Sequence, residues 1–174
     1  GTTDVELLRR AATALDDRLQ RAWRERAEGL PLASPAEALV LASLVEKETA
    51  VDDERPLVAG VFVNRLRLGM RLQTDPAVIY GMGAAFDGNL RRQDLRRDTP
   101  YNTYTRAGLP PTPIALPGAA SIVAATRPAS TGALYFVASG QGDGRHRFAS
   151  TLAEHNRNVA SYLATLRSSG EDRP

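Results

Sequence analysis

The stretch SPAEALVLASLVEKETA (residues 34–50) decides the fold, because it predicts a helix that is apolar on nearly every face. Ser34 is a typical N-cap, Pro35 suits the first helical position, and Glu37 occupies the third position of the first turn. A helix that is apolar all round, as residues 36–45 would be, is usually buried. The rest of the domain is therefore expected to pack around this segment.

Glu48 is the most informative residue of this helix. Burial on an apolar face would raise the pKa of its carboxyl, and the C-terminal end of the helix dipole acts in the same direction. A carboxyl that keeps its proton at neutral pH is what general acid catalysis needs. The periodicity leaves an alternative open, in which Glu46, Lys47 and Glu48 are the solvated end of the helix. Three apolar residues share the face of Glu48: Leu41, Leu44 and Val45.

Further helices are predicted on both sides of this segment. Thr3 and Glu6 have the spacing of a capping box, and Thr151 and Glu154 repeat it near the C-terminus. The third predicted helix carries Arg65 within a stripe that is otherwise apolar. The expected boundaries are Thr3 to Gly29, Asp52 or Asp53 to about Leu68, residues 118–127, and Thr151 to about Leu166.

The remaining segments predict one hairpin and one long irregular stretch. Residues 133–139 and 146–149 predict two strands around the glycine-rich turn 140–144. Residues 69–117 hold much of the glycine and proline, with at most a short helix over 75–80, and a loop of that length is uncommon unless it is functional. The predicted fold class is α+β, with helices packed around a small antiparallel sheet and a long irregular segment that forms a cleft.

Composition narrows the function. The 174 residues are 43% hydrophobic and 24% charged, which is typical of one globular domain. The absence of cysteine excludes disulfides and thiol catalysis, and His146 and His155 lack zinc-pair spacing, so neither a metal nor a cofactor is expected. A net charge of +2 argues against nucleic-acid binding. Only one of the 22 basic residues is a lysine, Lys47, which suggests that position 47 does not accept arginine freely.

Two polar motifs lie in the irregular stretch. Asp75 precedes a proline and either caps a helix or belongs to a polar cluster that faces a substrate. Residues 101–104 alternate tyrosine with polar side chains, which suits a carbohydrate cleft or, alternatively, a strand with its rings half in the core. Asn156, next to His155 on the last helix, either reaches such a cleft or lies at the surface.

Five stretches of the chain resemble the signature of the endolytic murein transglycosylases, the MltG or YceG-like family. They cover nearly the whole chain in order, and the resemblance implies that residues 1–174 are a single catalytic domain. The family's upstream membrane anchor and LysM-like domain would be absent from this chain. The five stretches are LASLVEKETA (41–50), NRLRLGMRLQTDPAVIYGMG (64–83), YNTYT (101–105), GLPP (108–111) and LYFVA (134–138).

The resemblance implies a lyase that acts on peptidoglycan. It would cleave the β-1,4 bond from N-acetylmuramic acid to N-acetylglucosamine within glycan strands and leave 1,6-anhydro-N-acetylmuramic acid ends. The family's single acid/base is the second glutamate of E-K-E, which is Glu48 and is also the residue that the periodicity singles out. A lysozyme-like hydrolase that uses Asp75 as a second carboxylate, and a non-catalytic glycan-binding module, remain alternatives.

The resemblance also implies surroundings for the site and for the protein. Peptidoglycan synthases are the implied protein partners, and the full-length protein would be anchored in the inner membrane with this domain on the periplasmic side. Supporting positions around Glu48 are expected at Ser43, Glu46, Lys47 and Asn156. Residues expected to bind the glycan are Gln73, Thr74, Asp75, Tyr101, Asn102, Thr103 and Tyr104.

Overall fold

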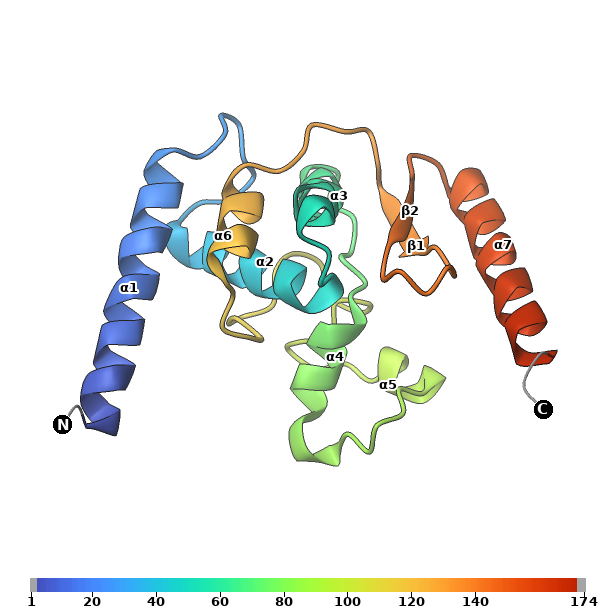
Figure 1. Cartoon of the computed structure of the whole chain (residues 1–174), viewed down its shortest axis with the longest axis horizontal. Coiled ribbons are helices and arrows are strands. Elements are labelled where there is room, and N and C mark those ends of the chain that lie inside the picture. Colours follow the sequence, from blue (N-terminus) through green and yellow to red (C-terminus); the bar gives the residue numbers. More distant parts are fainter. Residues whose placement is uncertain (1–2, 172–174) are drawn as a thin grey trace.

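The computed structural model of the chain describes residues 3–171 and is built mainly of helices, with one β-hairpin (Figure 1). The predicted α+β class is confirmed. Within the described residues, no helix is both long and apolar enough to cross a bilayer. The helices, including the short 3-10 turns η1 and η2, and the strands are α1 (Asp4–Arg24), α2 (Pro35–Glu48), η1 (Asp52–Glu54), α3 (Arg55–Arg67), α4 (Asp75–Met82), η2 (Gly83–Ala85), α5 (Arg92–Arg96), α6 (Ala119–Thr126), β1 (Tyr135–Ala138), β2 (His146–Ala149) and α7 (Leu152–Glu171).

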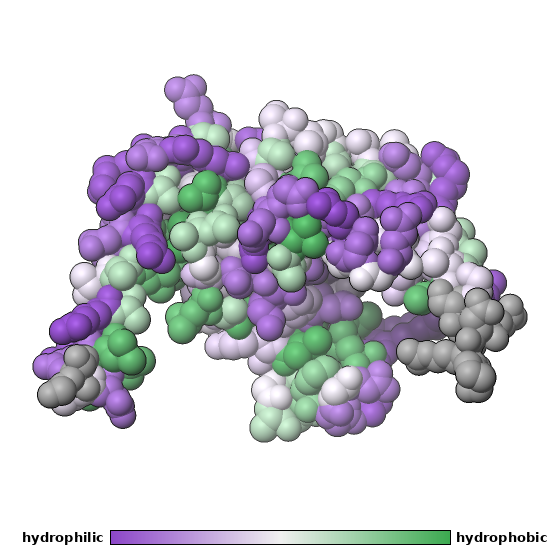
Figure 2. Space-filling model, viewed as in Figure 1, coloured by the Kyte–Doolittle hydropathy of each residue, from purple (hydrophilic) through white to green (hydrophobic). Residues whose placement is uncertain are grey.

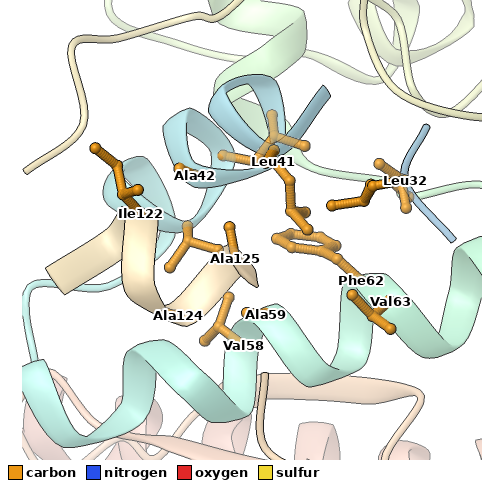
Figure 3. Close-up of a cluster of buried hydrophobic side chains, with 14 of the residues drawn as sticks. Leu32, Leu41, Ala42, Val58, Ala59, Phe62, Val63, Ile122, Ala124 and Ala125 are labelled. Atoms are coloured by element: carbon orange, nitrogen blue, oxygen red, sulfur yellow. The ribbon is translucent and has the colours of Figure 1, made fainter. Parts of the chain in front are cut away.

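The core lies where α2, α3 and α6 meet (Figure 3). Leu41 of α2 is 0% exposed, while Phe62 of α3 and Ile122 of α6 are each 1% exposed. Complete burial of side chains of this size contributes about 1.5–3 kcal/mol each relative to exposure. The expectation that residues 36–45 form a buried helix is confirmed, because the buried residues of α2 are Ala38, Val40, Leu41, Ala42, Ser43, Leu44 and Val45.

Gly60 allows the chain to cross closely over α3. A Cβ at this position would lie 2.6 Å from the carbonyl oxygen of Ala129, which no side chain tolerates. The crossing is fixed by a hydrogen bond from the Ala129 N–H to the Pro56 carbonyl at 2.9 Å. The segment after α6 is thereby led across α3 toward the hairpin.

The hairpin lies between α3 and α7 (Figure 1). Because side chains alternate across a strand, its two faces have different neighbours. On one face Phe136, paired with Phe148, packs edge-on against Phe62 of α3 with ring centroids 6.0 Å apart. On the other face Tyr135 stacks on His155 of α7 at 5.1 Å. The hairpin therefore joins the last helix to the core.

Two predicted helix boundaries were wrong. The helix α1 ends at Arg24 rather than near Gly29, because tertiary hydrogen bonds from Ala27 to Thr126 and from Arg127 to Glu25 tie the chain to the end of α6. The helix α7 continues to Glu171, beyond the predicted end.

Residues 69–117 contain more regular structure than predicted, since α5 was not expected. In the view of Figure 1, α4 and α5 lie below α2. Asn102 is 0% exposed, and its amide donates hydrogen bonds to backbone carbonyls in and next to α5. This helix of five residues is therefore held by a side chain from outside it, which local sequence patterns do not reveal.

Candidate active site

A pocket of about 180 Å³ opens at the C-terminal end of α2. Segments far apart in the sequence converge on it, from α2, α3, the turn before α4, the 101–104 turn and β1. In the space-filling view, the surface is hollowed beside the part that carries α4 (Figure 2). The pocket is lined by Glu48, Arg65, Leu72, Gln73, Asp75, Tyr104 and Phe136.

A larger groove, of about 530 Å³, runs between the N-terminal half of α2 and the proline-rich loop 108–113. Its lining is mainly apolar and includes a single titratable side chain, Glu37, whose carboxylate already accepts the N–H of Ala33 just before α2. Acid/base chemistry needs convergent titratable groups with perturbed pKa values, so the smaller pocket is the candidate active site.

Glu48 lies half-buried at the last position of α2. Burial raises the pKa of its carboxyl, and the negative charge of Asp75 acts in the same direction. The hydroxyl of Thr74, together with the positive charges of His146 and Arg65, opposes this rise. The Thr74 hydroxyl is itself buried and has no hydrogen bond of regular geometry to another described residue. The site therefore favours a protonated Glu48 while keeping groups that stabilise the carboxylate.

Arg65 is a buried cation beside Glu48 that was not assigned to the site from the sequence. It is 8% exposed, and its guanidinium donates to the carbonyls of Leu72 at 2.9 Å and Leu134 at 2.6 Å. It also lies over the Tyr135 ring at 5.2 Å. Arg65 thus links α3, the turn before α4 and β1. Leu72 and Phe136 were missed as well.

The turn before α4 is held in an unusual conformation at the pocket. Gln73 has a φ of 53°, the one positive φ outside glycine among the described residues. Its N–H donates to the Thr103 carbonyl at 3.1 Å, and the Thr74 N–H donates to the Thr103 hydroxyl at 3.0 Å. A left-handed backbone at a non-glycine residue costs of order 1–3 kcal/mol, so these contacts must offset it. They hold the Gln73 side chain against Arg65, whose Nη1 lies 3.4 Å from Gln73 Oε1.

Asp75 and Tyr104 form another part of the pocket wall. The Tyr104 hydroxyl donates to Asp75 Oδ1 at 2.6 Å. Burial and this hydrogen bond both raise the pKa of Tyr104, which keeps the phenol as a donor. Asp75 is the first residue of α4, and the N-cap position of that helix is occupied by Thr74.

The other residues expected to bind glycan lie outside the pocket lining. Asn102 and Thr103 are 0% and 2% exposed and support the two turns from within, so we expect them to shape the pocket rather than to touch a ligand. Tyr101 points elsewhere: its ring lies 5.0 Å from that of Tyr80, and its hydroxyl is 2.7 Å from that of Thr112.

Two of the four supporting positions join α2 to other segments. The Ser43 hydroxyl accepts the Ile114 N–H at 3.0 Å. Glu46 accepts hydrogen bonds from the Ser121 hydroxyl at 2.6 Å and from the Gly118 N–H at 3.0 Å, at the start of α6. The hydrogen bond from Ser121 lowers the pKa of Glu46 despite partial burial.

Lys47 and Asn156 are both exposed. Lys47 has no ion pair or hydrogen bond with another residue in the described part of the chain. Asn156 lies on α7 and does not line the pocket. Of the residues singled out from the sequence, the structure therefore brings Glu48, Gln73, Asp75 and Tyr104 together, with Thr74 directly behind them.

No group of three or more acidic or histidine side chains that could hold a metal ion is found among residues 3–171.

Comparison with known proteins points to one family. The model described as the YceG-like family matches residues 1–161. Proteins named "Endolytic murein transglycosylase" from Bacillus subtilis and Streptococcus pneumoniae are 44% identical over 127 residues and 38% identical over 131 residues, in each case over 73% of this chain. The aligned parts make up only 34% and 24% of those two proteins, so the chain spans about a third or less of the curated relatives.

The fold agrees with this sequence similarity. A crystal structure of a yceG-like protein from Listeria monocytogenes matches with a TM-score of 0.69 at 38% identity, covering 83% of this chain and 44% of that one. The family model spans the core, the pocket and the first half of α7. The chain belongs to the YceG-like family.

Proposed function

We propose that this domain is an endolytic peptidoglycan lytic transglycosylase. It would cleave the β-1,4 bond from N-acetylmuramic acid to N-acetylglucosamine within a glycan strand and leave a 1,6-anhydro-N-acetylmuramic acid end. The observation that carries the proposal is Glu48, whose carboxyl has a raised pKa in a polar pocket between Asp75 and Arg65. The names of the two bacterial relatives supply the reaction class.

A single carboxyl can perform both proton transfers of this reaction. Glu48, protonated, donates its proton to the glycosidic oxygen as the bond from that oxygen to C1 of the muramic sugar breaks. As a carboxylate it then takes the proton of the C6 hydroxyl, while O6 forms the new bond to C1. No water is consumed, and Glu48 ends protonated, ready for another turnover. General acid/base assistance of this kind contributes about 10²–10⁴-fold.

The remaining groups of the pocket suit the charges that develop. Positive charge builds on the muramic C1 and ring oxygen, where the carboxylate of Asp75 would stabilise it. Negative charge builds on Glu48 after proton donation, where Arg65 and the Thr74 hydroxyl favour the carboxylate. Arg65 also keeps the turn that carries Gln73 in place.

A hydrolase of the same bond is the second candidate, because Asp75 lines the same pocket as Glu48 and could activate a water molecule. Mass spectrometry separates the two reactions, since an anhydro end is one water lighter than a hydrolysed end. A non-catalytic glycan-binding module would release no fragments from purified peptidoglycan at all.

The same proposal includes the place where this protein acts and the proteins that it works beside. An enzyme that acts on peptidoglycan works outside the cytoplasm, and we predict that this one acts at the periplasmic face of the inner membrane. Peptidoglycan synthases are the predicted protein neighbours. The proposal is tested by digesting purified peptidoglycan with the domain and with Glu48→Gln, and by analysing the ends of the released glycans.

A further inference from the structure

A buried pair of Glu54 and His146 lies beside the Glu48 pocket and has no part in the mechanism above. Glu54, in η1, is 4% exposed. Both of its oxygens face His146 of β2: Oε1 accepts the backbone N–H at 3.0 Å, and Oε2 lies 2.8 Å from ring Nδ1. A carboxylate is buried at acceptable cost only when it is paired and hydrogen-bonded. The two residues therefore hold each other in one arrangement.

This contact defines which ring nitrogen of His146 can exchange a proton. Because the Glu54 carboxylate accepts at Nδ1, that nitrogen carries a hydrogen in the neutral ring as well as in the charged one. The other nitrogen, Nε2, makes no hydrogen bond to another described residue. In the neutral ring, Nε2 is therefore the nitrogen without a hydrogen.

The imidazole is packed against the wall of the pocket. Its ring meets Phe136 edge-on, with centroids 5.4 Å apart and planes at 88°. Phe136 lines the Glu48 pocket, and a positive charge on His146 acts to lower the pKa of the Glu48 carboxyl. In the sequence analysis, His146 was considered only as a zinc ligand, and its place beside the wall of the pocket was not predicted.

The charged groups around the two residues come from different elements. Glu48 is influenced by Asp75 of α4, Arg65 of α3 and His146 of β2. His146 faces Glu54 of η1. Its neighbour Arg145 lies 4.0 Å from Glu54 and is paired more closely with Asp53, at 3.0 Å.

We propose that His146, oriented by Glu54, is a positioning residue of the Glu48 site, and that its imidazole, when charged, places a positive charge beside the Glu48 carboxyl. A charged His146 helps Glu48 to give up its proton to the glycosidic oxygen. A neutral His146 leaves Glu48 a weaker acid. The inference rests on the proposed role of Glu48 as the acid/base.

The test uses His146→Asn, whose amide can still donate to Glu54 but never carries a charge. The matched control is His155→Asn, which changes the only other histidine, on the far face of the hairpin. The titration of the Glu48 carboxyl is followed by carbon-13 NMR, with Glu48→Gln identifying its signal. We expect His146→Asn to move this titration to higher pH by more than the scatter of repeat measurements, and His155→Asn to leave it in place.

The pH profile of kcat/KM provides the second readout. The alkaline limb, where Glu48 loses its proton, should move to higher pH in His146→Asn and not in His155→Asn. An unchanged Glu48 titration in His146→Asn overturns the inference. If the Asn variant does not fold, His146→Gln gives the same comparison. The NMR titration does not depend on turnover. An active Glu48→Gln would therefore refute the proposed function, whereas the effect of His146 on the Glu48 carboxyl would still be decided by the NMR titration.

Discussion

The Tyr104 hydroxyl donates a 2.6 Å hydrogen bond to Oδ1 of Asp75, in the same pocket as Glu48. This contact gives the two carboxyls of the pocket different roles. Asp75 accepts the hydrogen bond of Tyr104, whereas burial and the negative charge of Asp75 favour a protonated Glu48. When two carboxyl groups of one site have such different environments, one can act as the general acid and the other can provide electrostatic stabilisation.

Removal of the Tyr104 hydroxyl tests this division. In Tyr104→Phe, Asp75 loses its donor, and we expect kcat to fall roughly tenfold, the effect of about 1.4 kcal/mol. Thermal unfolding should change little, because the ring remains. Tyr101→Phe is the matched control: its hydroxyl contacts Thr112 outside the pocket lining, so its kcat should stay at the wild-type level. Equal losses in both variants would argue against a special role for the Tyr104–Asp75 contact.

The charge of Asp75 should be visible in the pH profile. Its negative charge raises the pKa of Glu48, so Asp75→Asn should lower that pKa. The general acid then loses its proton at lower pH, and the alkaline limb of kcat/KM should move to lower pH. The products should still carry anhydro ends. A variant that releases no anhydro ends while binding glycan normally would mean that Asp75 takes a direct part in the chemistry.

Two glutamates in the last turn of α2 should affect stability in opposite directions. The pKa of Glu48 is raised in the folded protein, so its carboxylate costs stability above that pKa, and the cost vanishes in acid below the unfolded value. The pKa of Glu46 is lowered, so its carboxylate contributes stability above the unfolded value, which is lost as the pH falls through the folded pKa.

Urea unfolding at neutral and acidic pH measures both effects. At pH 7, Glu48→Gln should be more stable than the wild type. Glu46→Gln should be less stable, by about 1 kcal/mol, because its hydrogen bonds to α6 lose their charge. Both differences should shrink in acid. A destabilised Glu48→Gln at pH 7 would contradict the raised pKa of Glu48.

Lys47 is the one lysine in the chain, and its replacement tests whether a lysine is needed at this position. It is exposed and makes no contact that fixes its side chain within the described residues, so Lys47→Arg should leave the free energy of unfolding unchanged, within about 0.5 kcal/mol. We expect turnover to fall nevertheless, because the compact ammonium next to Glu48 would contact the glycan. Wild-type turnover in Lys47→Arg would show that the lysine is incidental.

The central helix and its glutamate could be predicted from the sequence because their signals are local. Ser34 and Pro35 mark the start of α2, and the apolar residues on nearly all its faces predict that the helix is buried. The spacing of Glu48 from Leu41 and Leu44 places the carboxyl on one of those faces. The capping-box spacings and the glycine-rich turn of the hairpin are equally local patterns.

The rest of the site depends on contacts between distant residues. Arg65 stands out in the sequence as a charge within an apolar stripe. Its hydrogen-bond partners, however, are backbone carbonyls in the turn before α4 and at the residue before β1. Glu46 is adjacent to Lys47 in sequence, yet it hydrogen-bonds to Gly118 and Ser121, which are 72 and 75 residues away, and its carboxylate lies 4.0 Å from Arg55. Contacts between residues so far apart in the sequence produce no periodic pattern from which they could be predicted.

The decisive comparison is between the products of the wild type and of Glu48→Gln on purified peptidoglycan, measured by mass spectrometry. We expect internal glycan fragments with 1,6-anhydro ends from the wild type. Glu48→Gln should fold, bind the glycan and release none. Fragments that are one water heavier would contradict the transglycosylase reaction, and wild-type release by Glu48→Gln would contradict the assignment of Glu48 as its acid and base.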